Sequence, residues 1–187
     1  MSLEAGAVRR YTLSILVEDQ PGVLSQVARL FSRKGYNIES IVSGETDKPG
    51  ITRISIEILG DAGMIGRIAA QCRRLIPVRA VKILDEKNAL RREISLIKVA
   101  ATDRGARDQI LHLAQVFGAG VVDVSRDCLT MELSGDEGKT AALTELLKDY
   151  GILEIAKTGT IAMERGRSTI YGTDKLKEEY DYGKNVL

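Results

Sequence analysis

Residues 11–31, YTLSILVEDQPGVLSQVARLF, contain two periodicities in succession, with Pro21-Gly22 between them. Leu13, Ile15 and Val17 alternate along the first part, which predicts a strand with one buried face. After Pro21-Gly22 the spacing of the apolar residues becomes helical, at Val23, Leu24, Val27, Ala28, Leu30 and Phe31. A strand, a sharp turn and an amphipathic helix therefore begin the fold.

The rest of the first half predicts four further elements. They are a strand over 36–44, a strand after the turn at 47–50, a helix striped by Met64, Ile65, Ile68, Cys72 and Leu75, and a strand over 77–84. In the third strand Ile54, Ile56 and Ile58 alternate with polar residues, so we expect one buried face and one solvent-exposed face. The predicted order is β-α-β-β-α-β.

The same order recurs after a charged connector at 85–92. The second copy predicts strands over 94–101, 121–125, 129–133 and 152–163, with helices striped by Ile110, Leu113, Ala114, Phe117 and by Leu143, Leu146, Leu147, Tyr150. This split βαβ order is the ferredoxin-like motif. We therefore predict an α+β fold of two tandem ferredoxin-like domains, 9–85 and 92–165. The tail, 166–187, includes a charged stretch at 175–180 that we expect to be disordered or a short exposed helix.

Charge and composition argue against several classes of protein. Lys and Arg total 27 against 26 Asp and Glu, so no overall field attracts nucleic acid or an anionic membrane. No apolar run approaches the ~20 residues that span a bilayer, and residues 1–10 lack the apolar stretch of a signal peptide. Cys72 and Cys128 form no CxxC pattern, so we expect a reducing cytoplasm rather than a disulfide framework.

Residue types that catalyse reactions or bind metals are scarce. The only histidine, His112, lies off the apolar stripe of its helix, and neither cysteine has a histidine nearby in sequence. There is no Gly-rich phosphate loop. We therefore predict a chain without catalytic residues, metal or cofactor. An RNA-binding domain of this topology would need aromatic residues on central strands that here carry Ile and Val.

The junction Asp19-Gln20-Pro21-Gly22-Val23-Leu24 is the best candidate for a ligand site. Pro21 suits a helix start, and Gly22 lets another group approach the backbone closely. The N–H groups of Gly22, Val23 and Leu24 are expected to point outward at the positive end of the helix dipole, where a small carboxylate fits. The alternative is a plain turn, capped by Asp19 and satisfied by water. The corresponding junction in the second repeat, 102–107, lacks Pro-Gly and carries two arginines, so we expect no shared ligand.

Two segments resemble a known family. Residues 14–25, SILVEDQPGVLS, continuing to RKGYNIES at 33–40, look like an ACT domain, and specifically like the regulatory small subunit of acetolactate synthase, or acetohydroxyacid synthase. Residues 92–99, REISLIKV, resemble the start of the second domain of that subunit. The similarity extends over roughly residues 9–165, which is far more specific than one short motif.

The resemblance implies a function. In that family two ACT domains pair side by side as a homodimer and bind a feedback inhibitor, usually valine, between them. It assigns effector binding to Asp19, Gln20, Pro21, Gly22, Val23 and Leu24, with Asn37 and Ile38 contributed by the facing subunit. The implied partner is the catalytic large subunit, which carries thiamine diphosphate, magnesium and FAD. The family more often has Asn where this chain has Asp19, which bears on effector affinity. A free-standing amino-acid sensor acting on another enzyme or on transcription is the alternative.

Overall fold

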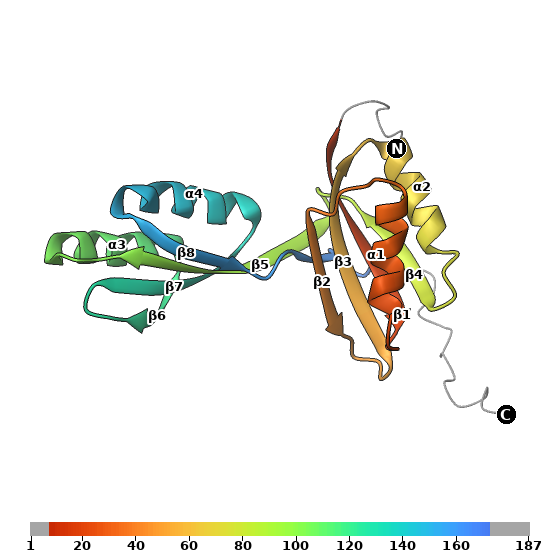
Figure 1. The fold of residues 1–187 in the computed structure, drawn as a ribbon, viewed down its shortest axis with the longest axis horizontal. Helices are drawn as coiled ribbons and strands as arrows, with labels where there is room; N and C mark the ends of the chain where they lie inside the picture. The colour runs from red at the N-terminus through yellow and green to blue at the C-terminus, as the bar shows by residue number, and fades with distance from the viewer. Residues whose placement is uncertain (1–7, 173–187) are drawn as a thin grey trace. The chain divides into compact units, whose positions relative to one another are not determined.

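The structure, a computed structural model, describes residues 8–172 as two α+β domains, each an antiparallel sheet with two α-helices (Figure 1). The first contains β1 (Arg9–Glu18), α1 (Val23–Arg33), β2 (Ser40–Glu45), β3 (Ile51–Gly60), α2 (Ala62–Cys72) and β4 (Val78–Leu84). The second contains β5 (Ala89–Ala100), α3 (Arg104–Phe117), β6 (Gly120–Val124), β7 (Cys128–Gly135), α4 (Glu137–Leu147), a 3-10 turn (Lys148–Tyr150), β8 (Ile152–Lys157) and β9 (Ile161–Glu164). The predicted fold class is confirmed.

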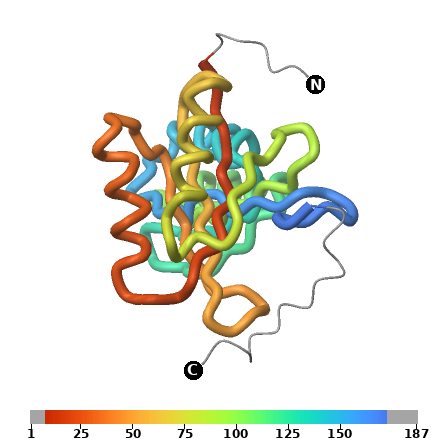
Figure 2. The backbone as a smooth tube through the Cα atoms, turned by 90° about the vertical axis from the view of Figure 1, so that its right-hand side faces the viewer, coloured from red at the N-terminus to blue at the C-terminus, as the bar shows by residue number. Residues whose placement is uncertain are grey.

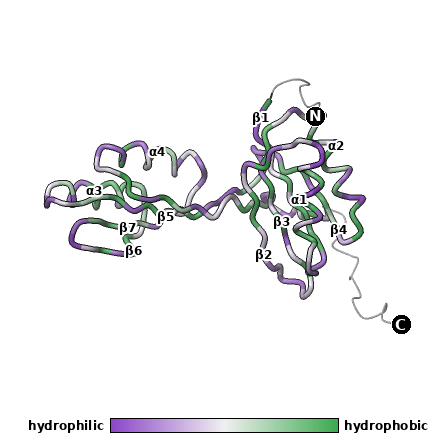
Figure 3. The backbone as a smooth tube through the Cα atoms, viewed as in Figure 1, coloured by the Kyte–Doolittle hydropathy of each residue, from purple (hydrophilic) through white to green (hydrophobic). Residues whose placement is uncertain are grey.

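The first sheet has the strand order β2-β3-β1-β4, and α1 and α2 lie side by side on one of its faces (Figures 1 and 2). Leu13 is paired with Ile56 of β3 and Ile83 of β4, so aliphatic side chains from three strands meet the helices. Phe31 and Ile68, both fully buried, come from the two helices. Figure 3 shows the hydrophobic colouring concentrated along these strands. The core of this domain is almost entirely aliphatic.

The two domains share their strand order and also one irregularity in strand register. The second sheet has the order β6-β7-β5-β8, the equivalent of the first, with β9 pairing to β5 as an addition. The β1–β4 register shifts between Leu16 and Val17, and the β5–β8 register shifts between Lys98 and Val99, at matching places in the two repeats. A bulge locally increases the twist and re-aims the strand end that follows it. The skipped residue lies on the edge strand in both domains, Arg79 of β4 and Leu153 of β8, so the irregularity is itself repeated.

Three predicted element boundaries are wrong. β2 begins at Ser40, so the predicted strand over 36–44 starts four residues too early. The connector predicted at 85–92 is a turn of residues 85–88, because β5 begins at Ala89. The predicted last strand is two strands, β8 and β9, separated by a break at 158–160. Of the predicted tail only the part up to Gly172 is described, and the charged stretch 175–180 lies outside the described residues.

The helix-free face of the first sheet is not the wet surface that alternation predicts. Ser14 of β1, Ser55 of β3 and Glu57 of β3 point to that face and are each no more than 3% exposed. Glu57 is paired there with Arg10, with 3.5 Å between Oε2 and Nη1. Polar side chains buried in this way require a cover over the sheet.

The chain divides into two compact units whose limits do not follow the repeat. The first contains residues 8–39, 43–90 and 162–172 of the described range, and the second contains 40–42 and 91–161. Residues 162–172, which begin inside β9, therefore group with the first domain, although residues 91–161 of the second unit precede them in sequence.

Candidate effector site at the start of α1

The turn between β1 and α1 depends on one glycine. Gly22 occupies the position immediately before α1 with φ +86° and ψ −6°, in the left-handed region. A Cβ built on Gly22 would meet no atom within 4 Å. The backbone conformation, rather than crowding, therefore requires glycine, since other residues cost roughly 1–2 kcal/mol there.

The first N–H groups of α1 are only partly satisfied. Val23 N–H donates to the Gln20 carbonyl at 3.3 Å and closes the turn, so the expectation that it points outward unpaired is wrong. Within residues 8–172 the N–H groups of Gly22, Leu24 and Ser25 donate to no acceptor, and no side chain caps the helix. Unpaired helix-start donors attract an anion. Ser25 is therefore an addition to the predicted set of residues.

The other three α-helices in the described part of the chain, α2, α3 and α4, begin with an aspartate cap. Asp61, Asp103 and Asp136 accept from the backbone N–H three residues later, at 2.8, 2.8 and 2.9 Å. Asp19 makes no such bond, because Gly22 holds the cap position and Asp19 lies three residues before it. The Asp19 cap expected for a plain turn is therefore absent. Its carboxylate is exposed and has no hydrogen bond or ion pair among the described residues.

The loop itself is held firmly. Asp19 N–H donates to the Gly50 carbonyl at 2.8 Å, which ties the loop to the β2–β3 turn. Figure 2 shows this turn, in orange, at the same end of the domain as the red start of α1. Glu18 forms an ion pair with Arg79 and accepts from Gln20 Nε2 at 2.9 Å. The residues around the unpaired donors are thus positioned before any ligand arrives.

Asn37 and Ile38 lie far from this loop within one chain. They occupy an irregular segment before β2, at the other end of α1, and the 11 residues of that helix measure about 16 Å. Asn37 is exposed and donates from Nδ2 to Glu39 Oε1 at 2.7 Å, while Ile38 packs on the core. The structure therefore does not bring the two parts of the predicted site together within one copy.

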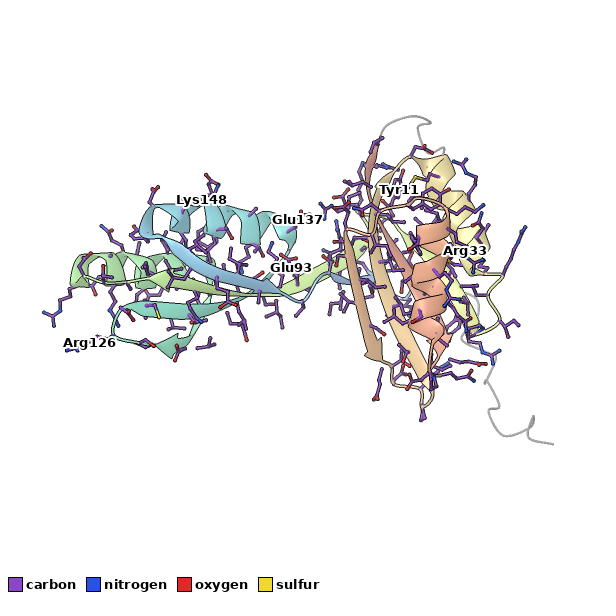
Figure 4. The ribbon with its side chains drawn as sticks, viewed as in Figure 1. Tyr11, Arg33, Glu93, Arg126, Glu137 and Lys148 are labelled. Atoms are coloured by element: carbon purple, nitrogen blue, oxygen red, sulfur yellow. The ribbon has the colours of Figure 1, made fainter. Side chains whose placement is uncertain are left out.

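The matching junction in the second domain is closed by its own side chains. Asp103 caps α3, and Arg107 Nη2 donates to the carbonyls of Ala101, Ser125 and Arg126 at 3.3, 2.8 and 2.9 Å. Arg126, labelled in Figure 4, marks the β6–β7 turn that is held in this way. The Asp103 carboxylate already occupies the start of α3, so this junction suits a carboxylate ligand less well than the junction at the start of α1 does.

Residues that act in catalysis or metal binding form no group elsewhere in the described chain. Within residues 8–172 no cluster of His, Cys, Asp or Glu is arranged to hold a metal ion. Burial raises the pKa of the Cys72 thiol to about 11, which suppresses its nucleophilic form. Over the same range no helix is long and apolar enough to cross a membrane.

Comparison with known proteins bears on both domains. Residues 13–80 match a family described as AHAS small subunit-like ACT domain, so the first domain is an ACT domain, and residues 92–166 match the small subunit of acetolactate synthase. The chain belongs to the acetolactate synthase small subunit family. It is 43% identical over 166 residues to an acetolactate synthase small subunit of Aquifex aeolicus, covering 89% of this chain and 86% of the relative.

Two further relatives extend the comparison. A probable acetolactate synthase small subunit of Methanothermobacter thermautotrophicus is 42% identical over 160 residues, which is 86% of this chain and 95% of that one. The crystal structure of the acetolactate synthase small subunit of Thermotoga maritima matches with a TM-score of 0.79 and 38% identity, covering 84% of this chain and 98% of that chain. The predicted family is confirmed.

Proposed function

We propose that this chain is the non-catalytic regulatory subunit of acetolactate synthase. It binds and activates the catalytic large subunit, and it makes that enzyme sensitive to a branched-chain amino acid, valine in the first instance. The observation that carries the proposal is the uncapped start of α1. Within residues 8–172 the Gly22, Leu24 and Ser25 N–H groups are unpaired, whereas α2, α3 and α4 each begin with an aspartate cap.

The junction offers both charges that a free amino acid requires. The N–H groups at the helix start suit its carboxylate, and the unpartnered Asp19 carboxylate suits its ammonium group. Leu24 is 44% exposed beside them and supplies apolar surface for a branched side chain. An aspartate in place of the more usual asparagine strengthens the contact with ammonium, provided that the ligand carboxylate faces the helix and not Asp19.

A second copy completes the site. β2 lies at the edge of the first sheet and runs parallel to β1, since both are antiparallel to β3. Two β2 edges paired antiparallel about a twofold axis place the end of one copy's β1 level with the start of the other copy's β2. Asp19 of one copy then lies at the same end as Asn37 and Ile38 of the other. This arrangement supports a homodimer with the effector between the copies.

Regulation follows from a coupled equilibrium. An amino acid bound across two copies favours one dimer geometry, and that geometry changes how the dimer holds the large subunit. A coupling free energy of about 1–3 kcal/mol suffices. In this scheme the thiamine diphosphate, magnesium and FAD belong to the large subunit, and this chain contributes only effector binding and contact.

Co-purification and calorimetry test the proposal. The tagged chain should retain a thiamine-dependent large subunit from its native cell, and titration should show binding of valine, leucine or isoleucine. Gly22→Asp and Asn37→Ala should each abolish inhibition while activation of the large subunit persists. Absence of the large subunit would favour the free-standing sensor, and unchanged inhibition in both variants would disprove the site.

A mixed dimer tests the two-copy site directly. A heterodimer of a Gly22→Asp chain and an Asn37→Ala chain has one site with both changes and one site with neither. At an amino-acid concentration that saturates the wild-type dimer but leaves both homodimeric variants largely empty, it should therefore bind about half as much amino acid as the wild-type dimer. A site contained in one copy predicts no binding by the heterodimer.

A further inference from the structure

Residues 162–172, here called the C-terminal strap, return to the first domain after the second domain is complete. Arg165 N–H donates to the Asn88 carbonyl at 2.8 Å at the beginning of the strap. Ala162 packs against Leu84 of β4 and against Ala89, and all three are at most 6% exposed. The strap thus supplies part of the cover over the helix-free face of the first sheet.

Lys82 of β4 anchors the strap at its middle. Its ammonium forms an ion pair with Glu164 and donates to the Thr169 carbonyl at 2.7 Å, with Ser168 Oγ at 3.4 Å. The Lys82 and Glu164 side chains are only 23% and 18% exposed. A partly buried lysine with three oxygen partners holds its segment more firmly than a surface ion pair does.

The end of the strap closes a groove beside β4. The groove has a volume of about 330 Å³ and is lined by Arg73, Val78, Arg79, Ala80, Val81, Ile170 and Tyr171. Tyr171 also lies under Lys48, with 5.0 Å between the Lys48 Nζ and the ring centroid. The strap therefore reaches both β4 and the β2–β3 turn.

One line of contacts leads from Lys48 to the effector loop. Lys48 N–H donates to Thr46 Oγ1 at 3.2 Å, and that hydroxyl donates to the Ile51 carbonyl at 2.9 Å, which makes the β2–β3 turn stiff. Gly50 in the same turn accepts from Asp19 N–H at 2.8 Å. A displacement of Lys48 is therefore passed to the backbone of Asp19.

A second line leads from the groove to the next residue of the loop. Arg79 lines the groove together with Tyr171 and forms an ion pair with Glu18. The Glu18 carboxylate accepts from Gln20 Nε2 at 2.9 Å. Loss of the strap removes Tyr171 from the groove wall beside Arg79, whose side chain is 46% exposed, and so loosens the position from which Arg79 holds Glu18. The two lines end on adjacent loop residues, Asp19 and Gln20.

We propose that the C-terminal strap is an element with docked and undocked states that positions the effector loop, and that its docking strengthens amino-acid binding at the start of α1. Lys82 and Tyr171 are positioning residues, since neither belongs to the loop. The inference rests on the proposed effector site. Because coupling is reciprocal, a bound amino acid also stabilises the docked strap.

Two pairs of variants test this coupling. Lys82→Met removes the charge that holds the strap while keeping the length of the side chain, and Lys82→Arg restores a charge. Tyr171→Ala removes the ring under Lys48, and Tyr171→Phe restores it. Lys98→Met, which removes an exposed ion pair with Glu154 in the second domain, is the matched control. In titrations of the full chain, Lys82→Met and Tyr171→Ala should bind valine at least about fivefold more weakly than wild type. The other three variants should bind valine with wild-type affinity.

Hydrogen exchange separates failure of the strap from failure of the effector site. Without any amino acid, Lys82→Met and Tyr171→Ala should exchange faster than wild type in peptides covering residues 18–26 and 46–51. Wild-type exchange in those peptides overturns the strap proposal, and so does unchanged valine affinity in both variants. If the wild-type chain binds no branched-chain amino acid but the two variants still exchange faster than wild type, the proposed ligand is overturned and the coupling between strap and loop is supported.

Discussion

Gly22 allows the charge at the effector site to be tested separately from the fold. Asn and Asp have almost the same size and tolerate left-handed backbone better than other residues do, and both are good helix caps. A Cβ at Gly22 meets nothing within 4 Å, so neither substitution is crowded. The free energies of unfolding of Gly22→Asn and Gly22→Asp should therefore differ by only a few tenths of a kcal/mol, and both should lie roughly 1 kcal/mol below that of wild type.

The two variants should differ strongly in binding. If a ligand carboxylate sits on the N–H groups of Leu24 and Ser25, it lies about 4 Å from a carboxylate introduced at Gly22. Two unit charges at that distance interact by about 1 kcal/mol in water and about 4 kcal/mol at an effective dielectric constant of 20. Valine should therefore bind Gly22→Asp between roughly fivefold and several hundredfold more weakly than Gly22→Asn.

Calorimetric titration with valine at low and high salt measures this difference. Because salt screens the repulsion between the two carboxylates, the difference in valine affinity between Gly22→Asn and Gly22→Asp should shrink as the ionic strength rises from about 0.05 to 0.5 M. Thermal unfolding of both variants provides the control for folding. Equal affinity of Gly22→Asn and Gly22→Asp at low salt would refute the reasoning, because it would mean that no carboxylate binds at the start of α1.

Three further predictions concern stability. Asp61→Ala should cost about 1 kcal/mol in urea unfolding because Asp61 caps α2, whereas Asp19→Ala, which removes no cap, should leave the midpoint unchanged. Partial burial opposes ionisation of Glu164, but hydrogen bonds from Lys82 and Ser168 and the Lys82 charge hold its pKa below the usual 4.5. The stabilisation that ionised Glu164 confers is therefore complete above pH 4.5 and is lost as the pH falls through the lowered pKa. The free energy of unfolding of wild type should accordingly exceed that of Glu164→Gln near neutral pH, and this difference should disappear on acidification. Burial raises the pKa of the Cys72 thiol from 9.0 to about 11, so between those pH values the thiol ionises in the unfolded chain but not in the folded one. As the pH rises through this range, the free energy of unfolding of wild type should fall by roughly 2–3 kcal/mol relative to that of Cys72→Ala.

Local patterns were sufficient to predict the order of elements and the core. Alternation at Leu13, Ile15 and Val17 and helical spacing after Gly22 each reflect burial on one face, and the structure buries those three β1 residues. The duplicated order made the assignment stronger, because errors of a few residues at each boundary leave the order unchanged. The predicted turn at Gly22 is present, and its positive φ explains why glycine stands there.

Features that depend on distant residues escaped local patterns. Alternation along β3 predicts a wet face for Ser55 and Glu57, but each is only 3% exposed. Ala162, which packs on Leu84, comes from a part of the chain far away in sequence. Lys82 and Glu164 are separated by 82 positions, and neither residue type nor spacing marks them as partners. The predicted strand over 36–44 includes Asn37, whereas pairing with β3 begins only near Glu39, whose N–H donates to the Glu57 carbonyl.

The return of the strap to the first domain has a consequence for synthesis of the chain. The first domain's sheet and helices are complete at Leu84, yet its anchor for Lys82 is Glu164, which leaves the ribosome only after about 80 more residues. At 5–20 residues per second this is a delay of about 4–16 s, during which the helix-free face of the nascent sheet has no strap over it. A nascent first domain is therefore exposed to chaperones and to other nascent copies at that face, and a chain that stops early loses part of its first domain rather than only its last.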